Sequence, residues 1–132
     1  MPFAFSLDLA TGVPVYRQII DQVTTGMATG SLKRGDQLPT VRQLAVDLAI
    51  NPNTVVRAYR ELEIRGVLET QQGTGTFIST KEVRLDEADR ERRLDLIVGD
   101  FTARAGAGGF TISDLVERLI ALQPAPVKKK GK

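Results

Sequence analysis

Four polar side chains that form directed hydrogen bonds lie close together in the sequence between residues 42 and 57. Asn53, Thr54 and Arg57 fall at positions i, i+1 and i+4 of a predicted helix and so share one of its faces. Asn can bond adenine at two atoms, Arg can bond guanine or phosphate, and Thr can bond either type of base. Arg42 lies in the first turn of the preceding predicted helix, where a cation is slightly unfavourable unless a polyanion is near. Together they predict a DNA contact rather than four solvated side chains.

A glycine-rich turn at residues 72–75 is the second candidate. Gly73 and Gly75 allow close approach of the backbone, and the amides and the Thr74 hydroxyl can meet phosphate or a minor groove. On its own the turn fits a simple hairpin connection better than a phosphate contact. It lacks the Lys and the following helix of a nucleotide-binding loop, which excludes that alternative.

The composition removes most catalytic chemistry. The chain has neither Cys nor His, and therefore no thiolate, no disulfide, and none of the commonest general base or metal ligand. We predict no enzyme activity, no metal site and no cofactor. No apolar run approaches the roughly 18 residues of a membrane span, and the first residues lack the features of a signal peptide. The expectation is a cytoplasmic protein without a membrane partner.

The net charge of +2 is unevenly distributed. Residues 1–80 carry seven basic and seven acidic side chains, whereas residues 128–132 alone carry four lysines. Any basic surface on the first segment must therefore be local. The basic tail, residues 123–132, is interpreted as a flexible solubilising end, although it could also add DNA affinity through counterion release.

Three helices are predicted in the first half of the chain. The first runs from Pro14, at its first helical position, to Gly30 and is followed by a loop over residues 32–39. The second starts at a Thr40–Gln43 capping box and stops near residues 49–50. The third spans residues 51–65, with Asn51 as its cap. Apolar residues at helical spacing face inward, among them Tyr16, Ile19, Ile20, Val23, Val41, Leu44, Val55, Tyr59 and Leu62.

The spacing of the second and third helices is that of a helix-turn-helix, since about three residues join them. A predicted hairpin follows directly, with strands on either side of the turn at 72–75 and a wing spanning residues 67–79. The predicted fold is α+β and mostly α: a winged helix-turn-helix over residues 1–80, then a short two-helix segment. In this fold the second helix of the helix-turn-helix, here residues 51–65, is called the recognition helix. Its N-terminal part enters the major groove.

Residues 81–122 predict two further helices, the first rich in alternating charges. The second is apolar over more than half of its circumference, which is too wide for a lone surface helix. Two such helices rarely bury enough surface alone, so they must pack on the winged helix, on a second copy, or on both. We favour a second copy and assign dimerisation to Leu94, Ile97, Val98, Phe101, Leu115, Leu119 and Leu122.

Four ordered segments, residues 38–45, 51–63, 66–68 and 73–78, resemble the GntR family of bacterial transcription regulators. Residues 12–19 are similar to the same family. The short C-terminus with its segment 109–115 resembles the YtrA subfamily. Together these motifs cover roughly residues 5–122, which makes the resemblance far more specific than a lone helix-turn-helix.

The resemblance implies a homodimer that binds a near-palindromic operator, usually as a repressor. It implies DNA contacts by Arg42, Asn53, Thr54 and Arg57, with Gly75 at the wing tip. YtrA-like regulators often control their own operon together with transporter genes, which nothing in this sequence shows. A small-molecule effector is left open. Other GntR groups often place a further Arg in the first turn of the recognition helix. This chain has Asn51, Pro52 and Asn53 there, so the base preference of those groups cannot be transferred to it.

Two rival functions remain at this stage. A winged helix with balanced charge can also be a protein-interaction module, in which case its binding would depend little on salt. A small enzyme would need converging catalytic groups that this sequence lacks.

Overall fold

The computed structural model describes residues 3–81 and 86–123, and the chain divides into two compact units, residues 1–81 and 82–132. Apart from Gln123, the predicted basic tail at 123–132 lies outside the described residues. The predicted division into domains at residue 80 falls one residue from the boundary between these units.

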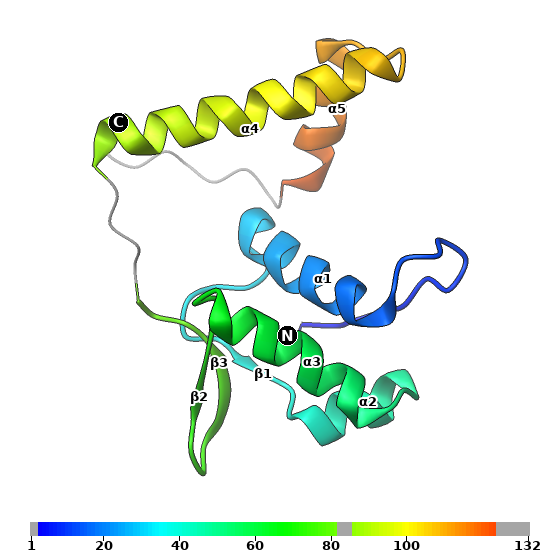
Figure 1. Cartoon of the computed structure of the whole chain (residues 1–132), viewed down its shortest axis with the longest axis vertical. Coiled ribbons are helices and arrows are strands. Elements are labelled where there is room, and N and C mark those ends of the chain that lie inside the picture. The colour runs from blue at the N-terminus through cyan, green and yellow to red at the C-terminus, as the bar shows by residue number, and fades with distance from the viewer. Residues whose placement is uncertain (1–2, 82–85, 124–132) are drawn as a thin grey trace. The chain divides into compact units, whose positions relative to one another are not determined.

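The first unit is a three-helix domain with a small antiparallel sheet (Figure 1). Its elements in chain order are α1 (Val15–Thr29), β1 (Gln37–Leu38), α2 (Val41–Leu48), α3 (Pro52–Ile64), β2 (Leu68–Gln71) and β3 (Gly75–Ile78). The strand order is β1-β3-β2, and Figure 1 shows the β2–β3 hairpin projecting away from the helices. This is the winged helix-turn-helix that the sequence predicts.

One predicted loop contains a strand. Within the expected loop at 32–39, Gln37 and Leu38 pair with Phe77 and Thr76 of β3. A strand of two residues has no alternation to detect, so periodicity could not predict it. Leu38 of this strand is buried in the core, and this fixes the start of the segment that leads into α2.

Local caps account for the starts of α2 and α3. The Thr40 hydroxyl accepts the Gln43 N–H at 3.0 Å, and the Asn51 side chain accepts the Asn53 N–H at 2.8 Å. Such bonds satisfy amides that the first helical turn leaves without partners. Pro52 is the first residue of α3, directly after the predicted cap Asn51. The capping box at Thr40 is only half formed, because the Gln43 side chain does not return a bond.

Pro14 stands one position earlier in the helix than predicted. It is the N-cap of α1, with an extended ψ of 145°, rather than its first helical residue. Its carbonyl accepts the N–H groups of Arg17 and Gln18 at 3.0 and 3.1 Å. The helix therefore begins at Val15, and its end at Gly30 agrees with the prediction.

The core of the first unit lies where α3 packs against α1, α2 and the sheet. Leu44 and Ala45 face it from α2, and Val41 and Leu48 pack at its edge. Tyr59 is buried, and its hydroxyl donates to the Pro39 carbonyl at 2.7 Å, which ties the chain before α2 to the middle of α3. Burial raises the pKa of Tyr59, so this hydroxyl stays a donor. The largest fully buried side chains are Ile19, Ile20, Val23, Leu44, Val55, Leu62 and Ile78.

We expect Tyr59→Phe to lower the free energy of unfolding by about 1–2 kcal/mol, because it leaves the Pro39 carbonyl without its partner. Tyr16→Phe is the matched control, since the Tyr16 hydroxyl bonds none of the described residues; its loss should stay below about 0.5 kcal/mol. Urea unfolding measures both. Equal losses would mean that the hydrogen bond of the Tyr59 hydroxyl does not contribute to the free energy of unfolding.

The second unit consists of α4 (Glu87–Ala107) and α5 (Ile112–Leu122), which contact each other. Asp86 caps α4, and Thr111 caps α5 in a full capping box with Asp114. The backbone and side-chain hydrogen bonds from Thr111 lower the pKa of Asp114. Ion pairs such as Arg92 with Asp89, at 2.7 Å, run along the exposed start of α4, as the alternating charges predict.

Candidate nucleic-acid interface

The first two turns of α3 present an outward polar face. Asn53 and Arg57 are exposed and Thr54 is half-buried, whereas Val55 and Ala58 are fully buried. Because the apolar side of α3 is held against α1 and α2, the opposite side must face outward. The structure thus places the three predicted side chains of this helix on accessible surface, at the end where the Asn51 cap and Pro52 fix its start.

The two candidate arginines are both available to an external anion. Arg42 lies exposed in the first turn of α2, as predicted. Within the part of the chain that the structure describes, neither Arg42 nor Arg57 pairs with a carboxylate. Arg65, at the other end of α3, instead pairs with Glu61 at 3.2 Å. A guanidinium without an acidic partner keeps its donors free for phosphate or a base edge.

Arg57 has a partner that the sequence did not reveal. Its guanidinium carbon lies 3.8 Å from the centroid of the Tyr16 ring, over the face of that ring. Tyr16 was predicted only as part of the apolar face of the first helix, and it is half-buried at the start of α1. No sequence signal links two residues on separate helices in this way, because the contact depends on how α1 crosses α3.

The wing is the β2–β3 hairpin, and its turn is Gln72, Gly73 and Thr74. Thr74 is exposed at this turn, as a contact residue would be. Gly75 is not at the tip; it is the first residue of β3 and pairs with Gln71. The expectation that Gly75 lies at the wing tip is therefore wrong, and the glycine within the turn is Gly73.

Gln37 is a second residue that the sequence did not reveal, and it braces the wing. Its side-chain amide donates to the Thr74 carbonyl at 3.2 Å. A Cβ on Gly75 would lie 2.6 Å from the Gln37 amide nitrogen, and the φ of Gly75 is +138°. The backbone angle therefore requires glycine at 75, and an added Cβ would also displace the end of the Gln37 side chain.

We expect Gly75→Ala to lower the free energy of unfolding by about 2–3 kcal/mol, because it strains the backbone and displaces Gln37. Gly73→Ala is the matched control: its φ is +77°, and nothing lies within 4 Å of an added Cβ. It should cost only about 1 kcal/mol. Urea unfolding of both variants tests this difference, and equal costs would refute the role of the close approach.

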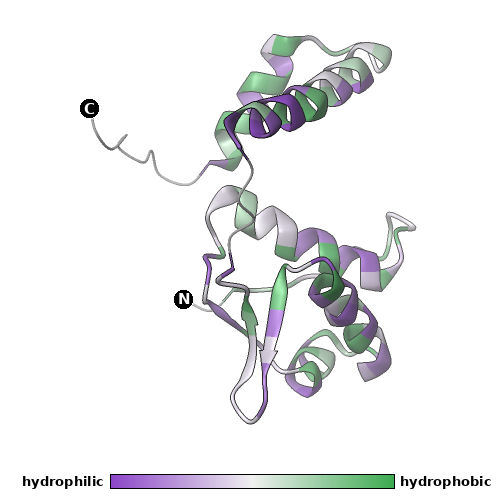
Figure 2. Ribbon diagram, turned by 60° about the vertical axis from the view of Figure 1, so that its left-hand side comes forward, coloured by the Kyte–Doolittle hydropathy of each residue, from purple (hydrophilic) through white to green (hydrophobic). Residues whose placement is uncertain are grey.

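The predicted dimerisation residues lie on α4 and α5 and remain largely exposed. Of the residues named for this role, Leu115 is half-buried and the others are exposed, Ile97 by 66%. Within the described part of the second unit only Ala105 is buried, so the two helices have almost no core of their own. Figure 2 shows the hydrophobic colour along the ribbons of both helices.

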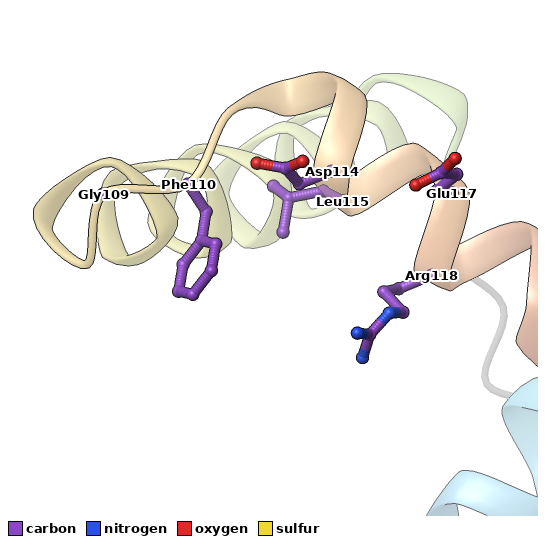
Figure 3. Close-up of a pocket in the computed structure, with 6 residues that line it drawn as sticks. All are labelled: Gly109, Phe110, Asp114, Leu115, Glu117 and Arg118. Atoms are coloured by element: carbon purple, nitrogen blue, oxygen red, sulfur yellow. The ribbon is translucent and has the colours of Figure 1, made fainter.

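An open hollow of about 590 Å³ lies beside the turn between α4 and α5. Figure 3 shows its lining, with Phe110 and Arg118 on either side. Both bonds that the Asp114 carboxylate accepts from Thr111 go to the same oxygen, Oδ2, and they belong to the capping box of α5. We assign no effector to this hollow.

The geometry defines a class of protein. A helix-turn-helix presents polar side chains at the start of its second helix, and a hairpin follows. Two arginines of this surface, Arg42 and Arg57, have no carboxylate partner in the described part of the chain. This is a winged helix-turn-helix of the DNA-binding kind, in which that helix reads the major groove. No helix in the described residues is long and apolar enough to cross a bilayer.

The chain belongs to the GntR family of bacterial regulatory proteins, whose model matches residues 15–78. The HTH-type transcriptional regulator Rv1152 of Mycobacterium tuberculosis is 40% identical over 113 residues, which cover 86% of this chain and 88% of that protein. The chain is therefore a DNA-binding transcriptional regulator and not an enzyme. This confirms the family resemblance and the fold class that the motifs predicted.

Two further relatives carry the YtrA name. The HTH-type transcriptional repressor YtrA of Bacillus subtilis is 48% identical over 73 residues, covering 55% of this chain and 56% of that protein. A solved structure of YtrA from Sulfolobus acidocaldarius, a GntR-family transcription factor, is 33% identical with a TM-score of 0.56. It covers 75% of this chain and 97% of that one. The similarity to YtrA-type members is thus present in both sequence and structure.

Proposed function

We propose that this chain is a homodimeric repressor that binds a near-palindromic operator upstream of its own operon. The observation that carries the proposal is the exposed face of Asn53, Thr54 and Arg57 at the capped start of α3. Repression follows from occupancy, since a bound dimer blocks a promoter. The printed name of the Bacillus subtilis relative, a transcriptional repressor, supports this direction of regulation.

In this proposal each element of the first unit has a separate task. Asn53, Thr54 and Arg57 read base edges in the major groove. Arg42 binds the phosphate backbone, and the wing, through Thr74 and the backbone beside Gly75, approaches phosphate or the minor groove. Phosphate contacts fix the register, and base contacts choose the sequence.

Residues 81–122, and above all the helices α4 and α5, would supply the dimer. Two helices that bury only Ala105 between them need a partner surface, and a second copy offers an identical apolar face. Two-fold pairing would set the recognition helices about 34–36 Å apart, which is one turn of DNA. A near-palindromic operator is the DNA counterpart of this symmetry.

Fluorescence anisotropy tests the proposal directly. The labelled duplex comes from upstream of the chain's own gene, a scrambled duplex is the control, and each is titrated at 50 and 200 mM salt. We expect tight binding to the upstream duplex that survives at 200 mM, and weak binding to the scrambled duplex that disappears. Equal weak binding to both duplexes would contradict autoregulation. Binding to neither would favour the protein-interaction alternative.

A further inference from the structure

The stack of Arg57 on Tyr16 gives a residue outside the recognition helix a part in DNA recognition. We propose that Tyr16 is a positioning residue whose ring holds the Arg57 guanidinium in the orientation that binds DNA. The inference rests on the proposed function, in which Arg57 is a DNA contact. The juxtaposition that carries it is the 3.8 Å distance from the Arg57 guanidinium carbon to the centroid of the Tyr16 ring.

The stack leaves the hydrogen-bonding edge of Arg57 free. A guanidinium is planar, and its N–H groups point outward within that plane. The Tyr16 ring covers one face of the plane, so the donors at its edge can still reach guanine or a phosphate. Stacking and DNA binding are therefore compatible, and Tyr16 need not touch the DNA itself.

Nothing else among the described residues competes for Arg57. No carboxylate there pairs with it, and the side chain is otherwise exposed. An exposed arginine loses most of its rotational freedom when it binds, which weakens the binding. A ring that already restricts the side chain reduces that loss. The cation–π attraction also strengthens when DNA excludes water from the pair.

The ring itself is held firmly in place. Ile19 and Ile20, one turn further along α1, are buried in the core. One turn into the helix, the Gln18 carboxamide bonds both the N–H and the carbonyl of Asp8, at 2.9 and 3.0 Å, and the Val13 carbonyl at 2.9 Å. These bonds clamp the preceding segment to the start of α1. Tyr16 itself is half-buried against the core, whereas Arg57 is exposed, so Tyr16 is the anchored member of the pair.

A double-mutant cycle tests the inference on the full chain, with the duplex from upstream of its own gene as the probe. The variants are Tyr16→Leu, Arg57→Ala and the double variant. Tyr16→Leu retains apolar cover over the core but has no aromatic face. Tyr16→Phe is the conservative control, since it keeps the ring. Thermal unfolding of each variant checks that the domain is folded.

We expect Tyr16→Leu to weaken binding about three- to tenfold, in line with a partly desolvated cation–π contact. Tyr16→Phe should remain within about twofold of the parent. In the Arg57→Ala background Tyr16→Leu should have no further effect, because the side chain that it positions is gone. A merely structural role for Tyr16 would weaken binding in both backgrounds.

The outcomes separate the inference from the proposed function. If Arg57→Ala weakens binding but Tyr16→Leu does not, the positioning role is wrong and the DNA contact stands. If Tyr16→Leu has the same effect with and without Arg57, the positioning role is also wrong. If Arg57→Ala leaves binding unchanged, the DNA contact fails and the positioning role fails with it.

Discussion

Replacing Ile97 with Glu is expected to convert the protein from a dimer to a monomer and to weaken operator binding by about 100-fold or more. Ile97 lies on α4 with 66% of its surface exposed in the single chain. In the proposed dimer it is covered by the second copy, and each subunit would then bury an unpaired carboxylate. A monomer reaches one half-site only and loses the advantage of two linked contacts.

Leu9→Glu is the matched control for this prediction. Leu9 is 79% exposed and lies in the first unit, ahead of α1. Both substitutions place a charge at an exposed apolar position, so both would be silent in a protein that stays monomeric. Analytical ultracentrifugation gives the mass in solution, and anisotropy gives the operator affinity. If Ile97→Glu remains as dimeric as Leu9→Glu, the interface does not lie on this face of α4.

Replacing Arg57 with Ala should weaken specific operator binding by about 1–3 kcal/mol, the cost of losing one base or phosphate contact. The exposed guanidinium has no acidic partner among the described residues, so its removal leaves no buried charge behind. We therefore expect the domain to remain folded, with the whole effect in DNA affinity. Titration of the upstream duplex at fixed salt measures it.

Arg65→Ala is the matched control for Arg57→Ala, because it removes one positive charge at the other end of the same helix. Arg65 follows the last residue of α3 and pairs with Glu61 rather than facing an external partner. We expect its effect on affinity to stay near or below about 0.5 kcal/mol. If Arg57→Ala and Arg65→Ala weaken binding equally, general charge attraction is responsible and Arg57 is no specific contact. Titration of both variants with the scrambled duplex as well shows whether either one has lost discrimination between base sequences.

The elements of this fold were predictable because their signals are local. Thr40 and Asn51 each cap a helix that starts where the sequence places it. Apolar spacing identified the buried faces, including Val55, Tyr59 and Leu62 in α3. A cap or a periodic face involves residues within a few positions of one another, so one sequence contains the whole signal.

The contacts that organise the candidate site were not predictable in this way. β1 is too short to show a period, and its residue Gln37 braces a turn 37 positions away. Gly75 was expected at the wing tip, but the structure places it in β3 beside Gln37. The position of each depends on strand pairing across the sheet, which no local pattern encodes.

The sequence by itself determined the winged helix-turn-helix, the outward polar residues at the start of the recognition helix, and the family. Only the tertiary structure decided that Tyr16 lies under Arg57 and that Gln37 supports the wing. The physical reason is the range of the interactions. Caps and amphipathic faces depend on neighbours along the chain, whereas these two contacts exist only once α1 has packed on α3 and β1 has paired with β3.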